Sequence, residues 1–323
     1  MATIEQIACK KLISDTLPYH ATLAWERFRP DSQPPVAVSL LKKRSKTAIY
    51  KIDGVGPDGS SVAAKLCRKH VAAHERKIYE QILPSVPVSY PLYCGSVQES
   101  DTHDWLFLEY IEGEQYSRSR EDHSILVGKW LGLLHSTAAQ VTAAAQFPDR
   151  GPRYHLIRLQ EARNNLKHSL KLLKLPAAEL AVIDDVISQC DLVESRWSHV
   201  EQWCACLPCT LVHGDFKPRN VVIRTCDTES SVFVFDWETS GWGVPTADVS
   251  YADIASYHKA ARRHWPDVSI EDVHIMKTVG RIFRGIEEFR WESEKLDPRW
   301  EASTIKLNYY CERMAEAIQM AQW

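Results

Sequence analysis

The sequence predicts an α+β fold that has a small strand-rich N-terminal part and a large, mostly helical C-terminal part. Short apolar segments separated by turn residues are concentrated in the first 110 residues, which is typical of strands. After Gly113, longer stretches carry apolar residues at helical spacing. We therefore expect two domains, at residues 1–110 and 111–323, because a chain of 323 residues is long enough for two modest hydrophobic cores.

The N-terminal part is expected to contain about five strands and one helix, preceded by a short amphipathic helix. Residues 3–17 have apolar side chains on one helical face, and the prolines between residues 18 and 35 predict a loop-rich connection. A glycine cluster at residues 54–59 is typical of a hairpin turn. The main helix is predicted at residues 71–83, ending before Pro84. The strands are predicted at residues 36–41, 48–52, 61–66, 93–97 and 105–110.

The C-terminal part is predicted to be helical apart from one pair of strands. The strand pair is expected at residues 211–223 and 232–236, where apolar residues run together between turn signals. From Ala252 onward the pattern is helical, with breaks expected near Pro266 and Pro298. Before the strand pair, helices are predicted at residues 123–145, 155–174 and 177–203.

The composition is that of an ordinary globular protein. Hydrophobic residues make up 45% and charged residues 25% of the chain, and a formal net charge of −3 gives no reason to expect a nucleic-acid partner. No apolar run approaches the roughly 20 residues of a membrane helix, so no membrane partner is expected. The N-terminus lacks the charged region and apolar core of a signal peptide. We therefore expect a cytoplasmic protein that is a monomer or a homodimer.

The nine cysteines follow no regular framework and are expected to be reduced thiols. Cys204, Cys206 and Cys209 form one cluster that, together with His213, has the ligand types of a structural zinc site. However, no second cysteine pair lies at zinc-ribbon spacing. Free thiols are therefore the default interpretation, and zinc is the alternative.

The segment from Leu211 to Asn220, followed by the aspartate at position 236, carries the chemistry. Asp215 and Asp236 each follow a short apolar run, so each is expected near a strand end. Transfer of a phosphoryl group from ATP needs a carboxylate that orients the acceptor hydroxyl and takes its proton, and it needs oxygen ligands for magnesium. Asp215 is the candidate for the first role, and Asn220 and Asp236 are candidates for the second. The alternative is that two ordinary turns use Asp and Asn for their turn propensity.

The spacing of these residues resembles the protein-kinase catalytic loop followed by a second, metal-binding aspartate. Two departures narrow the resemblance. Gly214 stands where protein kinases have arginine, and Trp237-Glu238 follows Asp236 in place of Phe-Gly. In these respects the chain is similar to the aminoglycoside phosphotransferase family and its choline-kinase-like relatives. The resemblance covers about residues 40–260 and implies a bilobal protein-kinase-like fold and a small-molecule kinase activity.

The resemblance also implies a nucleotide-binding lysine and its partner. Lys65 lies at the end of the third predicted strand, where it would contact the phosphates and pair with a glutamate of the next helix. Glu75 is the first candidate for that partner and Glu80 is the second. The alternative is a strand-end lysine whose stem is buried and a solvated glutamate.

Further nucleotide contacts are expected from the backbone and from one loop. Backbone groups of Glu109 and Ile111, in the segment that joins the two lobes, would bind adenine. The phosphate-covering loop would be residues 42–47, which has four basic residues and no glycine. Ser45 in this loop would donate to a phosphate; the alternative is a solvated turn.

Three other residues near Asp215 receive expected roles from the same resemblance. Lys217 would reach the γ-phosphate and offset the charge that builds on the transferring group. His213 would orient the loop through hydrogen bonds. Asp248, at the end of Gly243-Val244-Pro245-Thr246-Ala247-Asp248, is interpreted as structural, capping a helix that starts at residue 249.

The expected function is ATP- and Mg²⁺-dependent O-phosphotransfer to the hydroxyl of a small molecule, with GTP not excluded as the donor. An aminoglycoside-type or other antibiotic is the first expectation for the acceptor, and choline, an amino alcohol, homoserine or a sugar is the alternative. A catalytically silent kinase-fold binding module is a third interpretation, which the intact catalytic set disfavours. The side chains available to a cationic acceptor are Asp253, Glu271, Asp272, Glu287, Glu288, Glu292, Trp242, Trp265, Trp291 and Trp300.

Overall fold

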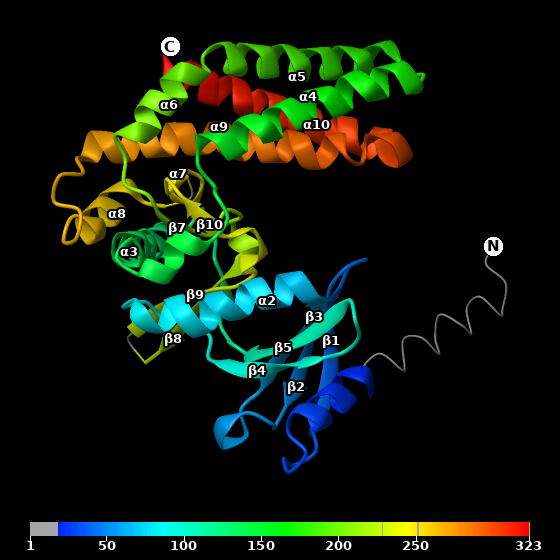
Figure 1. The fold of residues 1–323 in the computed structure, drawn as a ribbon, viewed down its shortest axis with the longest axis vertical. Helices are drawn as coiled ribbons and strands as arrows, with labels where there is room; N and C mark the ends of the chain where they lie inside the picture. Colours follow the sequence, from blue (N-terminus) through cyan, green and yellow to red (C-terminus); the bar gives the residue numbers. More distant parts are fainter. Residues whose placement is uncertain (1–18, 228, 251, 323) are drawn as a thin grey trace. The chain divides into compact units, whose positions relative to one another are not determined.

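The structure is a computed structural model that describes the whole chain except residues 1–18, 228, 251 and 323. The helix expected at residues 3–17 therefore lies outside the described residues. The fold is mixed α+β, as predicted. An antiparallel sheet forms much of the N-terminal part, and most of the remaining chain is helical (Figure 1).

The chain divides into two compact units, which we describe separately. The strand-rich unit comprises Met1–Ser85, Ser89–Tyr116 and Arg219–Glu238, and the helical unit comprises Val86–Val88, Ser117–Pro218 and Thr239–Trp323. The sequence predicted a boundary at residue 110, whereas the strand-rich unit also takes in residues 111–116 and 219–238. Hydrogen bonding is the reason, because β6 (Glu114–Gln115) pairs with β8 (Val221–Cys226), which in turn pairs with β9 (Glu229–Val234).

The main sheet of the strand-rich unit contains the five predicted strands. All neighbours are antiparallel, in the order β1-β2-β3-β5-β4. The hairpin predicted at the glycine cluster joins β2 to β3. The strands are β1 (Ala37–Lys43), β2 (Ala48–Asp53), β3 (Val62–Arg68), β4 (Tyr93–Gln98) and β5 (His103–Glu109).

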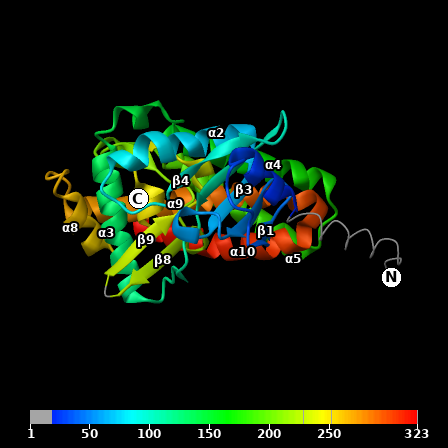
Figure 2. The same ribbon diagram turned by 90° about the horizontal axis from the view of Figure 1, so that it is seen from below.

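Helix α2 (Lys69–Lys77) packs on strands β3 and β5 at one face of this sheet (Figures 1 and 2). The predicted helix at residues 71–83 is confirmed in position, but it begins earlier and its second half, Ile78–Ile82, is a π-helix. Tyr79 and Ile82 are buried in this turn. The helix thus places a row of side chains over the α2 face of β3.

Alternation along the strands separates the two faces of the sheet. In β5, Trp105 and Phe107 are buried in a cluster with the helical segment at residues 19–28. Leu106, between them, is buried with Cys67 of β3 and with helix α2. Successive strand residues point to opposite faces, so position 65 in β3 shares the α2 face with position 67.

Residues 19–28 form a helix where the surrounding prolines predicted a loop. Ala21, Ala24 and Trp25 are buried against the sheet, and Phe28 stacks on a phenylalanine of β5 with ring centroids 5.0 Å apart. These positions follow the i, i+3, i+4, i+7 spacing of an amphipathic helix. The prediction of a loop was wrong, because the prolines flank this segment and do not interrupt its helical spacing.

The helical unit consists of eight named helices and a two-stranded ribbon within the described residues. Helix α9 packs against α4, α7 and α10, while α3 packs against α8 (Figure 1). No helix in the described part of the chain is long and apolar enough to span a membrane. The helices are α3 (Glu121–Ala138), α4 (Pro152–Leu172), α5 (Ala177–Ser195), α6 (Trp197–Ala205), α7 (Thr246–Val249), α8 (Ile254–Ala261), α9 (Ile270–Ser293) and α10 (Leu296–Ala321).

Several predicted helix boundaries move. The helix expected at residues 123–145 ends at Ala138 and continues as a separate 3₁₀ turn, and the one expected at 177–203 divides at Arg196. The break near Pro266 is confirmed. Pro298 does not interrupt the helix, because α10 begins only two residues before it. A helix tolerates proline in its first turn, since the backbone N–H groups there have no partner within the helix.

The strands predicted to pair with each other at residues 211–223 and 232–236 belong instead to two separate sheets. Strand β7 (Thr210–Val212) pairs with β10 (Gly241–Gly243) in the helical unit. Strand β8 instead pairs with β9 in the strand-rich unit. The residues between β7 and β8 form the loop that the sequence identified as the catalytic centre.

Glycine allows the closest approach between two helices of the helical unit. A Cβ built on Gly280 of α9 would lie 1.9 Å from the carbonyl oxygen of Thr246 in α7. A Cβ on Gly285, also in α9, would meet Met314 instead, with the methyl carbon of that flexible side chain nearest at 2.6 Å. Both glycines therefore lie inside α9, but a Cβ at Gly280 would meet backbone whereas one at Gly285 would meet a flexible side chain.

We predict that Gly280→Ala lowers the free energy of unfolding by about 2 kcal/mol or more, because neither backbone can yield without moving a helix. Gly285→Ala should change it by less than about 1 kcal/mol, since the methionine can rotate and alanine favours the helix. Urea denaturation of both variants measures this difference. Equal effects would show that α7 and α9 do not approach as described.

Candidate active site

The centre of the strand-rich unit is an ammonium group held between two carboxylates. Lys65 lies on the α2 face of β3 and is buried. Its Nζ is 2.6 Å from Oε1 of Glu75 in α2 and 2.7 Å from Oδ1 of Asp236, which follows β9. The predicted pair of Lys65 with Glu75 is therefore present. Glu80, the second candidate, is exposed and lies 3.7 Å from Arg76 instead.

Burial and charge shift the pKa values within this cluster. Burial opposes the charged form of Lys65, but Glu75 and Asp236 outweigh it and hold the pKa of the ammonium well above its usual value. Burial raises the pKa of Glu75, Lys65 lowers it and Asp236 raises it, and together they place this pKa at about 7. Oε2 of Glu75 is also buried without a hydrogen-bond partner. Two carboxylates therefore share one cation here.

Asp236 and Asn220 are brought together by the backbone. The N–H of Phe235 donates to the carbonyl oxygen of Asn220 over 3.0 Å. Asp236 then has a φ of +70°, a left-handed conformation that aspartate tolerates better than most residues. This turn directs its carboxylate to Lys65. The three residues expected from the sequence to surround the phosphates and the metal therefore lie in one region of one unit.

These residues line a cavity of about 330 Å³ within the strand-rich unit. Its polar lining residues include Lys65, Glu75, Asn220 and Asp236. Seven further lining residues are apolar. The apolar lining residues are Leu41, Ile49, Ala63, Leu108, Ile111, Val222 and Phe235. A planar, partly apolar ligand with a charged end fits this division of chemistry.

Glu109 and Ile111 also line the cavity, as expected for the joining segment. The N–H groups of Glu109 and Tyr110 donate to Leu92 and Ser61 carbonyl oxygens, at 2.8 and 3.0 Å. The carboxylate of Glu109 accepts from Arg224 at 2.8 Å. A contact between this segment and a base would therefore use the carbonyl group of Glu109 or the N–H of Ile111.

Ser45 is not among the residues that line this cavity. It lies exposed in the turn between β1 and β2, which is closed by a 2.8 Å hydrogen bond from Arg44 N–H to the Thr47 carbonyl oxygen. Lys42, at the end of β1, lines the cavity in its place, and so does Arg219. Burial, followed by the nearby Arg44, lowers the pKa of Lys42. Sequence reasoning singled out the basic loop but could not tell which side chain faced inward.

In the helical unit, Asp215 lies between two cations. Its Oδ1 accepts from Arg284 of α9 at 2.8 Å, and its Oδ2 forms an ion pair with Lys217. Both cations also lie over the ring of Trp291, with Lys217 Nζ 5.2 Å and Arg284 Cζ 5.3 Å from the centroid. Lys217 is therefore close to Asp215, as expected. Arg284 was not found from the sequence, because nothing in a helical pattern distinguishes it from a solvated arginine.

The loop before Asp215 is held by Asp248. The carboxylate of this fully buried residue accepts from the N–H groups of His213 (2.6 Å) and Gly214 (3.1 Å), and from His135 Nε2 (3.3 Å). Burial alone would raise its pKa, but the hydrogen bond from His135 and the neighbouring groups place the pKa below its usual value. The expectation that Asp248 caps a helix is wrong. It lies inside α7 and binds the loop, while Nδ1 of His213 accepts from the Asp215 N–H at 3.3 Å.

Gly214 occupies a position that no other residue fits. Its φ is +76°, and a Cβ there would lie 2.7 Å from the Thr239 carbonyl oxygen. Thr239 also donates from its hydroxyl to the His213 carbonyl oxygen at 3.0 Å. The positive φ and the close approach of Thr239 thus explain why this loop has glycine where protein kinases have arginine.

The zinc alternative finds no support in the described part of the chain, where no three potential ligands among His, Cys, Asp and Glu come together. Cys204 is buried, and burial raises the pKa of its thiol to about 12, whereas Cys206 and Cys209 are exposed. The structure records all three as free cysteines.

The carboxylates available to a cationic acceptor are largely occupied. Glu287 accepts from Arg290 at 3.2 Å, and Glu288 accepts from Arg284 at 2.9 Å. Glu292 pairs with two lysines, at 3.1 and 3.5 Å. Asp253 and Asp272 accept main-chain N–H bonds at the starts of α8 and α9.

Comparison with known proteins assigns the class. A model of the phosphotransferase enzyme family matches residues 57–271, about two thirds of the chain. The chain therefore belongs to this family of small-molecule kinases. A search of curated proteins found no significant match.

Solved structures with the same fold include three kinases of small molecules. The GDP complex of aminoglycoside 2'-phosphotransferase-IIIa has a TM-score of 0.66 at 14% identity, covering 93% of this chain and 99% of that one. Spectinomycin phosphotransferase with ADP and spectinomycin has a TM-score of 0.56 at 11% identity (89% and 93%). Choline kinase from Cryptosporidium parvum Iowa II has a TM-score of 0.55 at 15% identity (88% and 89%). At these identities the likeness establishes the fold alone.

The raised pKa of Glu75 predicts a pH-dependent stability. The folded pKa of about 7 lies above the ordinary value of 4.5, so the folded state binds more protons between these values and stability falls as the pH rises through them. Relative to wild type, the neutral variant Glu75→Gln should gain about 1–3 kcal/mol between about pH 5 and pH 8. Urea denaturation across this range measures it, and a difference that is constant with pH would contradict it.

We predict that Gly214→Ala is more damaging than Gly59→Ala. Gly59 has nearly the same φ, +74°, but has nothing within 4 Å of a built Cβ. Gly59→Ala should therefore cost only the left-handed backbone, roughly 1–2 kcal/mol. Gly214→Ala adds the clash with Thr239 and should cost more, and it should also lower ATP turnover because the loop before Asp215 must move. Denaturation and turnover assays on both variants test this, and matching losses would contradict the clash.

Proposed function

We propose that the protein transfers the γ-phosphate of ATP to a hydroxyl group of a small molecule, with magnesium as the metal. The observation that carries this proposal is the cluster of Lys65, Glu75 and Asp236 in the lining of a cavity that also has many apolar residues. In kinases a strand lysine that pairs with a helix glutamate positions the nucleotide phosphates, and an aspartate nearby holds magnesium.

The nucleotide would lie in the cavity of the strand-rich unit. Its base would pack among the apolar side chains and bond to the backbone at Glu109 and Ile111, while Lys65 and Lys42 would face the phosphates. Two of the related structures named above hold GDP or ADP, which supports a nucleotide without choosing the base. ATP is proposed as the donor, and GTP is the alternative that a direct comparison of turnover decides.

Asp236 and Asn220 would hold the magnesium ion together with phosphate oxygens. A carboxylate and an amide are hard oxygen donors of the kind that magnesium prefers. When bound, the ion would neutralise the phosphate charge. Lys65 already holds Asp236 at this position, and the hydrogen bond to Asn220 keeps the two donors on adjacent segments.

Asp215 would orient the acceptor hydroxyl and take its proton. Arg284 and Lys217 each pair with one oxygen of this carboxylate, and Lys217 would also offset charge on the transferring phosphoryl group. Asp248 contributes by holding the main chain just before Asp215. Proton transfer and positioning of this kind typically contribute roughly 10²–10⁴-fold to the rate.

The acceptor is the open part of this proposal. An aminoglycoside or other cationic antibiotic was the first expectation from the sequence, and it remains a prediction. Glu288 and Glu292 are held in ion pairs, whereas Oε1 of Glu287 is buried without a hydrogen-bond partner. A metabolic hydroxyl compound is the alternative acceptor.

Two aspartate variants should fail in different ways. We predict that Asp215→Asn lowers kcat by roughly 10³-fold and leaves nucleotide affinity within about twofold, because it affects the acceptor. Asp236→Asn should instead weaken Mg²⁺-dependent nucleotide binding by at least about tenfold, because a carboxylate ligand carries full charge. Isothermal titration with MgADP and coupled turnover assays separate the two.

The control for the second variant is Asp58→Asn. Asp58 is exposed, and it also has a positive φ, +54°, in the same unit. It should leave both binding and turnover unchanged. If Asp215→Asn retained wild-type turnover, or if Asp236→Asn behaved like Asp58→Asn, the assigned roles would be wrong.

A further inference from the structure

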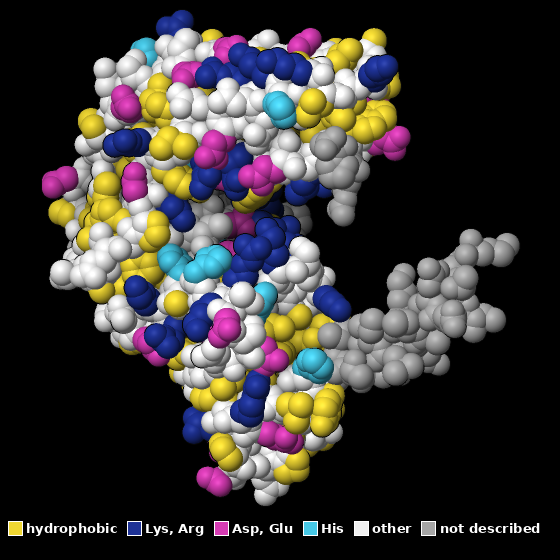
Figure 3. All heavy atoms as spheres, turned by 45° about the vertical axis from the view of Figure 1, so that its right-hand side comes forward, with side chains coloured by type: hydrophobic (Ala, Val, Ile, Leu, Met, Phe, Trp, Pro, Cys, Tyr) yellow, Lys and Arg dark blue, Asp and Glu magenta, His cyan; other side chains and the backbone are white. Residues whose placement is uncertain are grey.

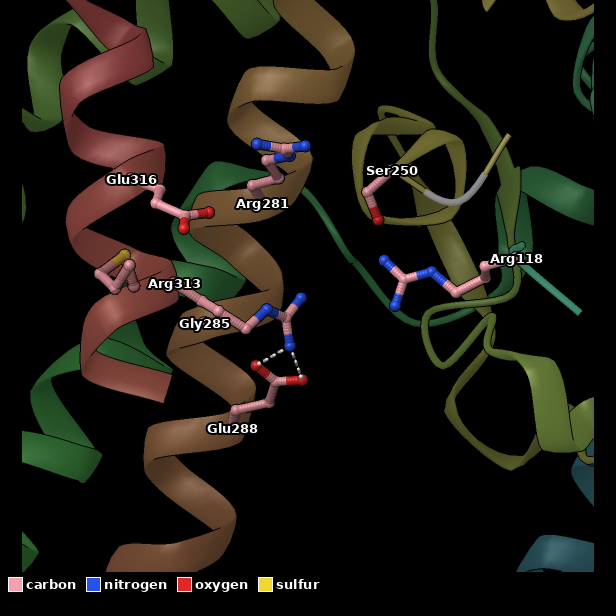
Figure 4. A pocket seen from close by; sticks show the side chains of 8 residues that line it. Arg118, Ser250, Arg281, Gly285, Glu288, Arg313 and Glu316 are labelled. Carbon is pink, nitrogen blue, oxygen red and sulfur yellow. Dashed lines mark hydrogen bonds and ion pairs between the residues drawn. The ribbon is translucent and has the colours of Figure 1, made fainter. Parts of the chain in front are cut away.

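A second cavity lies in the helical unit and is lined by arginines. It has a volume of about 130 Å³ (Figure 4). Three guanidinium groups and two carboxylates contribute to it, together with a hydroxyl group. The residues are Arg118, Ser250, Arg281, Gly285, Glu288, Arg313, Met314 and Glu316.

The arginines come from three different segments. Arg118 precedes α3, Arg281 lies on α9 and Arg313 lies on α10. In Figure 4 the side chains of Arg118 and Arg313 extend into the space from opposite sides, and Ser250, which follows α7, points toward it. Figure 3 shows both cationic and acidic side chains on one face of the molecule, whereas arginine is in excess among the charged residues that line this cavity.

A chain of ion pairs connects this cavity with the proposed catalytic carboxylate. Asp215 accepts from Arg284 at 2.8 Å, Arg284 donates to Glu288 at 2.9 Å, and Arg313 donates to both oxygens of Glu288 at 3.2 Å. All four residues belong to the helical unit. Arg281, Arg284 and Glu288 lie on one face of α9, since they are three and four residues apart.

The spacing of residues along α9 indicates the length of a ligand that would reach both the arginine-lined cavity and Asp215. Seven residues separate Arg281 from Glu288, which corresponds to roughly 10 Å of helix, and Arg284 lies between them. A group bound by the arginines and a hydroxyl bound at Asp215 would therefore be roughly 5–10 Å apart. This is the size of a sugar acid or a sugar phosphate.

The charges in the cavity favour an anion. Glu288 lies between two arginines, so its single charge is shared by Arg284 and Arg313. Burial, followed by the charges of Arg281 and Arg118, lowers the pKa of the neighbouring Lys277, as expected where positive charge accumulates. Guanidinium groups bind carboxylates and phosphates through paired hydrogen bonds, and Arg is the side chain best suited to this.

The same surroundings disfavour a cation. Recognition of an ammonium group uses carboxylates or the face of an aromatic ring. The face of Trp291 next to Asp215 already has Lys217 and Arg284 above it. A polycationic acceptor that bound at Asp215 would lie close to the positive charges of Lys217 and Arg284.

We propose that the acceptor is a hydroxylated anion, whose carboxylate or phosphate binds between Arg118, Arg281 and Arg313 while its hydroxyl lies at Asp215. The proposal rests on the phosphotransferase function proposed above and names its substrate class. In the transfer, the acceptor oxygen forms a bond to the γ-phosphorus, the bond to the β,γ-bridging oxygen of ATP breaks, and the hydroxyl proton goes to Asp215.

The first test compares acceptors that differ chiefly in charge. D-glucuronate, D-glucose and D-glucosamine form one matched set, and D-ribose 5-phosphate and D-ribose form another. We expect kcat/KM with MgATP to be at least about tenfold higher for the anionic member of a set than for the neutral or cationic one. The two sets distinguish a carboxylate from a phosphate. Equal or better turnover of glucose, ribose or glucosamine would overturn the proposal and leave the phosphotransferase function standing.

The second test removes the arginines one at a time. Arg281→Gln and Arg313→Gln should each raise KM for the anionic acceptor by at least about tenfold while KM for MgATP stays unchanged. Arg262→Gln, an exposed residue after α8, is the control for loss of one positive charge. An unchanged acceptor KM in both cavity variants would also overturn the proposal.

A binding measurement separates failure of this site from failure of the catalytic function. In the presence of saturating MgADP, inorganic phosphate or acetate should raise the melting temperature of the wild type and of Arg262→Gln. The shift should be lost in Arg281→Gln and Arg313→Gln. If this pattern holds but none of the acceptors is phosphorylated, the cavity is an anion site and its role in binding the acceptor is overturned, while the phosphotransferase function stands. If neither anion stabilises the wild type, the anion site is overturned.

Discussion

The strand-rich unit depends on one buried ammonium group. Lys65 joins a strand of the main sheet to α2 through Glu75, and to the end of β9 through Asp236, although Asp236 is 171 residues away in the sequence. Without the lysine, two carboxylates would face each other in a buried place, at a cost of several kcal/mol. The same contact that joins these segments also determines where a phosphate or a metal ion can bind.

The helical unit has a corresponding arrangement of opposite sign. There a buried carboxylate, that of Asp248, accepts hydrogen bonds from two main-chain N–H groups and from His135. The other ring nitrogen of His135 is 3.1 Å from the Tyr257 hydroxyl. Tyr257 lies on α8 and His135 lies on α3, so hydrogen bonds connect the loop before Asp215 with two helices. A loop fixed in this way needs no ligand to reach its described path.

The parts of this structure that the sequence predicted are those encoded by local pattern. Strand alternation and turn glycines identified the five strands of the sheet. Motif spacing predicted site roles for Asp215, Asn220 and Asp236, and those roles stay predictions. The pairing of β8 with β9 but not with β7 is decided by contacts between distant segments, and no local pattern carries it. Arg284 and Arg281 look like any solvated helix residue until α10 and the catalytic loop lie beside them. Pro298 and the helix at residues 19–28 were misjudged because proline restricts a helix interior but not its first turn or its flanks.

The segment after Asp236 has a consequence for control of the protein. It contains a 3₁₀ turn at Trp237–Thr239, the strand β10 and then α7, all within residues 237–249. Such short, hydrogen-bonded elements have no spare length to swing in and out, and Gly214 has no side chain with which to hold a phosphorylated residue. We therefore expect that phosphorylation of this segment does not switch the protein on and off as it does protein kinases. The output of this protein would be set by how much acceptor and nucleotide the cell supplies, and by how much of the protein it makes.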